Sequence, residues 1–145
     1  INSVAELEMF EFNNIDKVNQ VIFRGEVDFD SFFLAACDLG NVTCVFDEID
    51  MVCSPYGITD NLNRIIQYGR HLQVGLICAS RRPANVHRNL TSQAVEIISF
   101  NIQEPRDLKY LEDFCGYDFA SKLPSLGVGE FVRHPPQAEK RAELK

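Results

Sequence analysis

The chain has 145 residues and a formal net charge of −7 at pH 7, with 46% hydrophobic and 24% charged residues. These values are typical of one globular domain with a buried core, and the negative charge argues against a broad nucleic-acid-binding surface. No apolar run reaches the length of a membrane span, and no signal segment opens the chain. We therefore expect a cytoplasmic protein, or one of the host cytoplasm if it is viral. Because the first residue is Ile rather than Met, we expect a piece of a longer protein.

The charges are unevenly distributed. Five of the nine arginines lie within residues 64–88, a stretch that contains no acid. Such a local excess of positive charge favours contact with an anion or with an acidic neighbour. The five cysteines show neither C-x-x-C pairs nor metal-ligand spacing with the histidines, which indicates a reducing compartment.

Segments of strand character alternate with segments of helical character along the chain, after an acidic segment (residues 1–16) that fits either a helix turn or an edge strand. The strands are expected at residues 18–24, 42–46, 73–79, 96–102 and 130–133. The helices are expected at residues 28–39, 59–68, 83–90 and 105–115. Thr59 is the expected N-cap of the second and Pro105 opens the last, while Gly40, Gly69 and Gly116 are expected to end helices. Because helical crossovers join parallel strands, this alternation predicts an α/β fold with a mainly parallel sheet and flanking helices. Residues 1–134 would form the domain, and residues 135–145 a polar tail.

An acidic pair follows the apolar strand expected at residues 42–46. That strand reads as buried on both faces, and Asp47 and Glu48 come directly after it. Open α/β sheets bind ligands at the carboxyl ends of their strands. There, Asp47 would bind Mg²⁺ through water and Glu48 would accept a proton from an attacking water, with Asp50 as a third acid nearby. The structural alternative is a helix-entry cap or a solvated loop.

A second polar cluster follows the strand expected at residues 73–79. It consists of Ser80, Arg81 and Arg82 before Pro83, and should lie at the same edge of the sheet as Asp47. A guanidinium group there would neutralise phosphate charge. The alternative is an ion pair with the acids that only holds the loop.

Arg70 comes just after the helix expected at residues 59–68. It would either hydrogen-bond the last carbonyls of that helix or act as an arginine finger toward a neighbouring subunit. No glycine is followed by Lys, so the chain contains no G-x-x-x-x-G-K-[ST] phosphate loop.

The order of these motifs resembles that of a known family. The chain presents DE, GRH, VGLICAS, RRP, LTSQA, IISFNI, EPRDLKYLEDF and LPSLGVGEFV in succession. This order resembles the C-terminal half of the HerA/FtsK-like P-loop ATPases, including phage and plasmid members related to Zot-type and DNA-packaging ATPases. The resemblance covers about residues 18–134.

The resemblance implies a RecA-like core that assembles into a ring, usually a hexamer, and moves DNA with ATP and Mg²⁺. Asp47 would be the Mg²⁺-side acid of the Walker B strand and Glu48 the catalytic base. Ser80 and Arg81 would contact the nucleotide, and Arg82 together with Arg70, or Arg64 in its place, would be the catalytic arginines. The first strand and the phosphate loop of the family are absent from this chain, so we expect little ATPase activity from it by itself. The family often has Gln where this chain has Arg81, and Arg cannot accept a hydrogen bond.

Two other interpretations compete with a motor ATPase. One is a non-catalytic module that descends from such an ATPase and scaffolds a DNA or virion assembly. The other is an unrelated flavodoxin-like or Toprim-like domain that uses Asp47, Glu48 and Asp50 on a metal.

Overall fold

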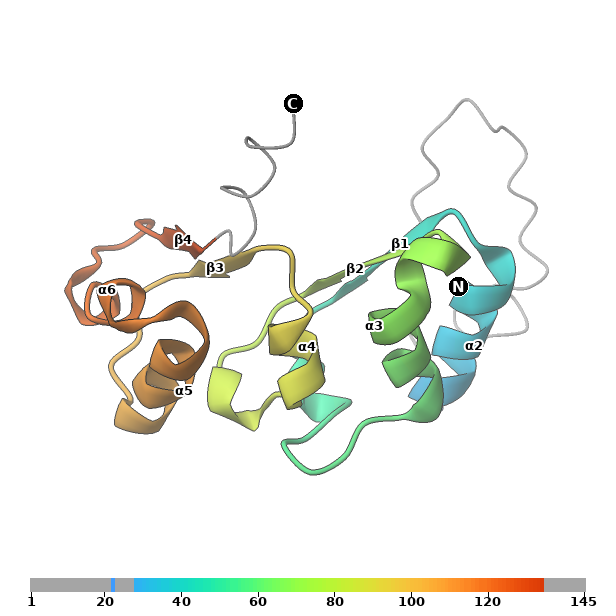
Figure 1. Ribbon diagram of the computed structural model, residues 1–145, viewed down its shortest axis with the longest axis horizontal. Helices are drawn as coiled ribbons and strands as arrows, with labels where there is room; N and C mark the ends of the chain where they lie inside the picture. Colours follow the sequence, from blue (N-terminus) through green and yellow to red (C-terminus); the bar gives the residue numbers. More distant parts are fainter. Residues whose placement is uncertain (1–21, 23–27, 135–145) are drawn as a thin grey trace. The chain divides into compact units, whose positions relative to one another are not determined.

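The computed structural model describes Ile22 and residues 28–134, which form two compact units. The first unit contains residues 28–46 and 58–78, and the second contains residues 47–57 and 79–134. Figure 1 labels their elements. The strand predicted at residues 18–24 lies outside the described residues except for Ile22, which is not in a strand. The segments predicted at residues 1–16 and 135–145 also lie outside them.

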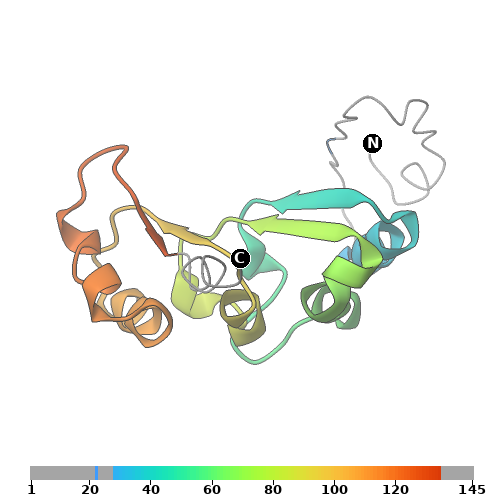
Figure 2. The ribbon, with the colours of Figure 1, turned by 45° about the horizontal axis from the view of Figure 1, so that its top comes forward.

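The first unit is a pair of parallel strands with two helices. Strand β1 (Val42–Phe46) pairs with β2 (Val74–Cys78) along its whole length. Helices α2 (Phe29–Leu39) and α3 (Asp60–Leu72) pack against each other and lie on one face of the strand pair (Figures 1 and 2). This unit confirms the predicted alternation of helix and strand.

Elements of the described part of the chain cover the strand pair on one face only, so the prediction that residues 42–46 are buried on both faces is wrong for this structure. Successive side chains of a strand point to opposite faces. Cys44 and Val74 are buried on the helix side, whereas Val45 is 71% exposed and Ile77 is 58% exposed. The apolar run was a correct signal for a strand, but not for the covering of its second face.

The start of α3 is tied to α2 by one acidic side chain. The carboxylate of Asp30 accepts hydrogen bonds from the backbone N–H and the side-chain amide of Asn61, each 2.8 Å long. The hydrogen bond from the backbone of Asn61 is the main cause that lowers the pKa of Asp30. Because the carboxylate satisfies an N–H in the first turn of α3, it acts as a cap supplied by another helix.

Helix α3 ends later than predicted. Thr59 is the residue before its first turn, as expected, but the helix continues through Gly69 to Leu72 and ends at Gln73, whose φ is 56°. A Cβ atom on Gly69 would lie 2.7 Å from the carbonyl oxygen of Val74. Gly69 therefore serves the close approach of α3 to β2 and does not end the helix. Arg70 lies in the last turn instead of after it.

The second unit consists of short elements around a small core. Its core contains Leu111, Phe119 and Leu123, and its two strands, β3 and β4, are antiparallel. The elements are η1 (Ile49–Met51), η2 (Pro83–Asn85), α4 (Arg88–Ser92), β3 (Ile97–Ser99), α5 (Pro105–Cys115), α6 (Tyr117–Ala120), η3 (Leu123–Ser125) and β4 (Val132–His134).

Two predictions for the second unit need correction and one helix was missed, while the helix at residues 105–115 is confirmed. The segment 83–90 forms a 3-10 turn and the start of a separate helix, not one helix. The strand expected at residues 96–102 is only three residues long, and α6 was not predicted. Within residues 28–134, the structure contains one parallel and one antiparallel strand pair, so it does not reproduce a mainly parallel sheet.

Two further properties concern the described residues. None of their helices has the length and apolar character needed to cross a membrane. The five cysteines, all within residues 28–134, form no disulfide there. Burial raises the pKa of the Cys44 thiol to about 11, as expected of a thiol in an apolar environment.

Candidate functional site

The segments that follow β1 and β2 are joined by backbone and side-chain contacts. The backbone N–H of Ile49 donates to the carbonyl oxygen of Ala79 at 3.0 Å. The Ser80 hydroxyl donates to Asp50 Oδ1 at 2.9 Å. As predicted, the acids after the first strand and the polar residues after the second lie together. We call Asp47, Glu48, Asp50, Ser80 and Arg81 the strand-end cluster.

Glu48 has an unusual backbone conformation for a residue with a side chain. Its φ and ψ are 56° and 50°, in the left-handed region, and it is the residue before the 3-10 turn η1. This region costs a residue with a side chain about 1–2 kcal/mol. Such strain is concentrated at functional sites, where the surrounding structure maintains it. Here the hydrogen bond from Ile49 to Ala79 fixes the backbone just after Glu48.

The carboxylate of Glu48 forms an ion pair with Arg81. The Arg81 side chain is 80% exposed and the Glu48 side chain 37% exposed. Exposed ion pairs of this kind contribute about 0–1 kcal/mol, so this one separates at little cost. The ion pair between this arginine and one of the acids, which the alternative interpretation expects, is therefore present in this structure.

Asp47 is exposed and makes no hydrogen bond or ion pair with any described residue. No group of three or more His, Cys, Asp or Glu side chains within residues 28–134 is arranged to hold a metal ion. Mg²⁺ typically keeps several waters and is bound by one or two carboxylates together with substrate phosphates. Asp47 therefore leaves its carboxylate available just after β1.

Arg82 does not join the acids after β1 but binds the start of α5. Its Nε donates to Asp107 Oδ2 at 2.8 Å, and its Nη2 lies 3.3 Å from Glu104 Oε2. Asp107 is only 1% exposed, and its other oxygen accepts a hydrogen bond from the backbone of Ala84 at 2.9 Å. We call Arg82, Glu104 and Asp107 the helix-start cluster.

Sequence reasoning missed Glu104 and Asp107. The Glu104 carboxylate accepts a hydrogen bond from the Asp107 N–H at 2.9 Å, which caps α5 and lowers the pKa of Glu104. The spacing Glu-Pro-x-Asp was a signal for this cap, since acids and Pro favour the first turn of a helix. Nothing in the sequence showed that Asp107 would be buried against Arg82.

The remaining predicted arginines, Arg64 and Arg70, belong to α3 in the first unit, and both are exposed. Arg70 and His71 occupy its last turn, where positive charge is favourable.

The fold of this chain is of the α/β class and is similar to that of a viral packaging NTPase. It is similar to solved structures of the genome packaging NTPase B204 from Sulfolobus turreted icosahedral virus 2. The structure in complex with sulfate gives a TM-score of 0.77 at 19% identity, over 93% of this chain and 67% of that one. The structure in complex with ATP-gammaS gives a TM-score of 0.75 at 19% identity, over 94% and 69%.

The sequence comparison gives a more particular result. The chain is 39% identical over 74 residues to the probable DNA double-strand break repair helicase HerA of Methanocaldococcus jannaschii, and 40% identical over 73 residues to HerA of Saccharolobus solfataricus. These matches cover 49% and 48% of this chain but only 15% of each relative. No model of a known protein family matches the chain. The predicted resemblance to HerA/FtsK-like P-loop ATPases is confirmed.

Proposed function

We propose that this chain carries the Walker B and sensor elements of an ATP-hydrolysing DNA translocase or packaging motor of the HerA/FtsK type. One observation carries the proposal: acids after β1 and polar or basic residues after β2 contact each other directly, through Asp50 with Ser80 and Glu48 with Arg81. The names of the relatives, DNA repair helicases and a genome packaging NTPase, support the same class of function.

The residues after β1 would perform the chemistry. Asp47 would hold Mg²⁺ through water, and the metal would neutralise charge on the nucleotide phosphates. Glu48 would accept the proton of the attacking water, a contribution of about 10²–10⁴ in rate. Arg81 pairs with Oε1 of Glu48 in this structure, so Glu48 would accept the proton on Oε2 or after this exposed ion pair has opened.

The residues after β2 would contact the nucleotide. Ser80 would donate a hydrogen bond to a phosphate, and Arg81, once released from Glu48, would neutralise phosphate charge. Arg82 would stabilise the transition state from a position fixed by the helix-start cluster. Arg70, or Arg64 in its place, would act on the nucleotide of a neighbouring subunit in a ring, a hexamer by analogy with the family.

ATP binding would also need elements that this sequence does not contain. Backbone N–H groups and the Lys of a phosphate loop hold the β- and γ-phosphates in P-loop NTPases, and no such motif occurs in the 145 residues. The chain spans about 15% of the length of its HerA relatives. Motor activity is therefore proposed for the complete protein.

The test is the Glu48→Gln variant of the complete protein. Gln keeps the size of the side chain and removes its basic oxygen, so ATP turnover should fall by at least about 10² while nucleotide binding stays unchanged. Glu96→Gln is the matched control, because Glu96 pairs with Arg133 and belongs to neither cluster. Normal turnover by Glu48→Gln would exclude Glu48 as the base.

A specific observation supports a second candidate, a non-catalytic scaffold in a DNA or virion assembly. The Glu48 carboxylate is already neutralised by Arg81, as expected if the acids only stabilise a loop. In this case the complete protein would show no nucleotide-dependent change in its association state. Analytical ultracentrifugation with and without ATP and Mg²⁺ distinguishes the two functions.

A further inference from the structure

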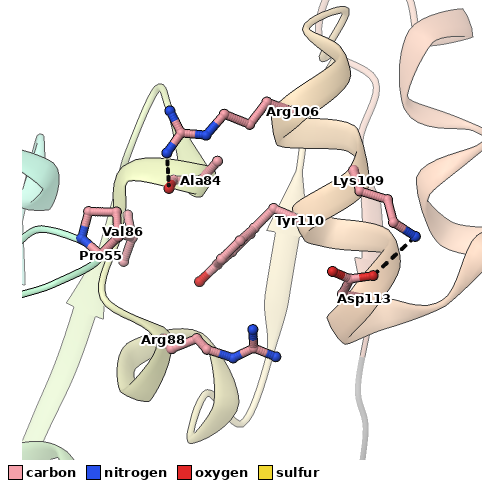
Figure 3. Close-up of a pocket in the computed structure, with 8 residues that line it drawn as sticks. All are labelled: Pro55, Ala84, Val86, Arg88, Arg106, Lys109, Tyr110 and Asp113. Carbon is pink, nitrogen blue, oxygen red and sulfur yellow. Dashed lines mark hydrogen bonds and ion pairs between the residues drawn. The ribbon is translucent and has the colours of Figure 1, made fainter.

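A pocket of 360 Å³ lies in the second unit, between α5, α4 and the turn η2. Figure 3 shows the Arg106 and Arg88 side chains on opposite sides of it and the Tyr110 ring directed into it. Pro55, Ala84 and Val86 form an apolar wall. The pocket shares no side chain with the strand-end or helix-start cluster, so its use would be additional to hydrolysis.

Two arginines provide the positive charge of this pocket. Lys109 also lines it, but Lys109 pairs with Asp113 at 3.2 Å and with Glu112 at 3.3 Å, so its charge is compensated. Arg106 makes only a 3.4 Å hydrogen bond to the carbonyl of Ala84, and Arg88 lies 4.9 Å from the centre of the Phe114 ring. Neither arginine forms an ion pair with a residue in the described part of the chain. Both guanidinium groups retain donors for an anion.

The aromatic ring in the pocket is held in place. The Tyr110 hydroxyl forms a 2.8 Å hydrogen bond with the Thr91 hydroxyl, and its ring packs on Phe114 with the ring centres 5.0 Å apart. Burial raises the pKa of Tyr110, so the phenol is neutral at physiological pH. A fixed, neutral aromatic ring beside two guanidinium groups is suited to stack with a planar group that carries a phosphate.

We propose that this pocket binds one nucleotide of a single strand, with the phosphates on its two sides on Arg88 and Arg106 and its base against Tyr110. A free nucleoside monophosphate shares the base and one of these phosphates. A base in a duplex is stacked on its neighbours and has no face available for the ring, so double-stranded DNA does not fit. An acidic peptide would use the arginines without needing the aromatic ring, and the contribution of Tyr110 therefore distinguishes the two classes of ligand.

The 145-residue chain is titrated without ATP, so the result does not depend on the proposed hydrolysis. The probe is a fluorescent oligothymidylate of about ten nucleotides, within the range of single-strand binding sites. Thymidine monophosphate, inorganic phosphate and oligoglutamate serve as competitors. Displacement by thymidine monophosphate would assign the pocket to free nucleotides as well, and binding of the oligomer only would assign it to single-stranded DNA.

The double variant Arg88→Gln/Arg106→Gln should weaken oligothymidylate binding at least about tenfold. Because two phosphate contacts are lost, the slope of log binding constant against log salt concentration should become shallower by about 1.4. The charge-matched control is Lys122→Gln/Arg133→Gln, because neither residue lines the pocket and Arg133 pairs with Glu96. It should bind like the wild type. If the double variant also binds like the wild type, the proposal is wrong.

The aromatic contact is tested separately, because Arg88 packs on Phe114 and its replacement could disturb the fold. Tyr110→Leu should weaken binding about tenfold, whereas Tyr110→Phe, which keeps the ring, should bind within about twofold of the wild type. Circular dichroism checks that each variant is folded. Unchanged binding by Tyr110→Leu, with oligoglutamate displacing the probe, would overturn the proposal and make the pocket an acidic-peptide site.

Discussion

The strand-end cluster and the helix-start cluster both join acids to arginines, but water reaches them to different extents. Arg81 and Glu48 pair with side chains that are 80% and 37% exposed, whereas Arg82 pairs with an Asp107 side chain that is 2% exposed. An exposed pair separates at little cost, while a buried acid that loses its partner is strongly destabilising. The comparison indicates that one cluster can rearrange during function while the other stays fixed.

The largest expected effect follows from removing the buried acid. Asp107→Ala would leave the Ala84 N–H without its acceptor and Arg82 without its closest partner. We expect a loss of about 2 kcal/mol or more in the free energy of unfolding, measured by urea denaturation. Asp113→Ala on the same helix is the control, because Asp113 is exposed and pairs only with Lys109. Equal effects of both substitutions would contradict the assignment of Asp107 as the fixed point.

The next effect concerns the strained backbone at Glu48. Glycine adopts the left-handed region without steric cost, whereas alanine does not. Both substitutions remove the ion pair with Arg81. The difference between their free energies of unfolding therefore reports the conformational preference of the backbone at this position. Glu48→Gly should be more stable to urea than Glu48→Ala by about 1 kcal/mol. Equal stabilities would mean that Glu48 leaves this conformation in solution.

A smaller effect is expected from the exposed pair. Arg81→Gln should change the free energy of unfolding by no more than about 0.5 kcal/mol, since the pair is largely in water. Urea denaturation at two salt concentrations measures this and should show little salt dependence in the variant. A loss of 2 kcal/mol would remove the distinction between the two clusters.

The smallest effect is a pH dependence at the start of α5. The hydrogen bond from the Asp107 N–H lowers the pKa of Glu104 below its ordinary 4.5. Because the pKa of Glu104 is lower in the folded than in the unfolded state, its ionised carboxylate stabilises the fold above pH 4.5. This stabilisation is lost as the pH falls through the pKa of the folded state. Stability curves for the wild type and Glu104→Gln should therefore converge on acidification below pH 4.5. Parallel curves would show that the cap is not formed.

Local signals in the sequence predicted most elements between residues 28 and 116. Gly40, Pro105 and Gly116 correctly indicated where helices begin or end, because these signals act on neighbouring residues. Thr59 correctly marked the start of α3, but its side chain makes no capping hydrogen bond, and Asp30 of α2 supplies the cap instead. Gly69 misled for a tertiary reason: its missing side chain serves contact with the backbone of Val74. The pairing of short strands β3 and β4 also depends on distant residues, so periodicity could not show it.

The sequence predicted which two segments form the candidate site, because both segments directly follow predicted strands. The contact between the segments after β1 and β2 follows from their parallel pairing, which the alternating pattern indicated. Which acid each arginine selects did not follow, because Arg81 and Arg82 are adjacent and the side chains of neighbours diverge. Arg81 binds Glu48, and Arg82 binds Asp107, 25 residues further along the chain.

The most direct test of the account is single-turnover ATP hydrolysis by the complete protein carrying Glu48→Gln or Arg81→Gln. Glu48→Gln should bind ATP but lose turnover by at least about 10². Arg81→Gln removes a group that would neutralise phosphate charge but leaves the base in place, so it should still hydrolyse ATP, with weaker nucleotide binding than the wild type. Full hydrolysis by Glu48→Gln, or none by the wild type with Mg²⁺ and DNA present, would contradict the proposal that these strand ends hydrolyse ATP.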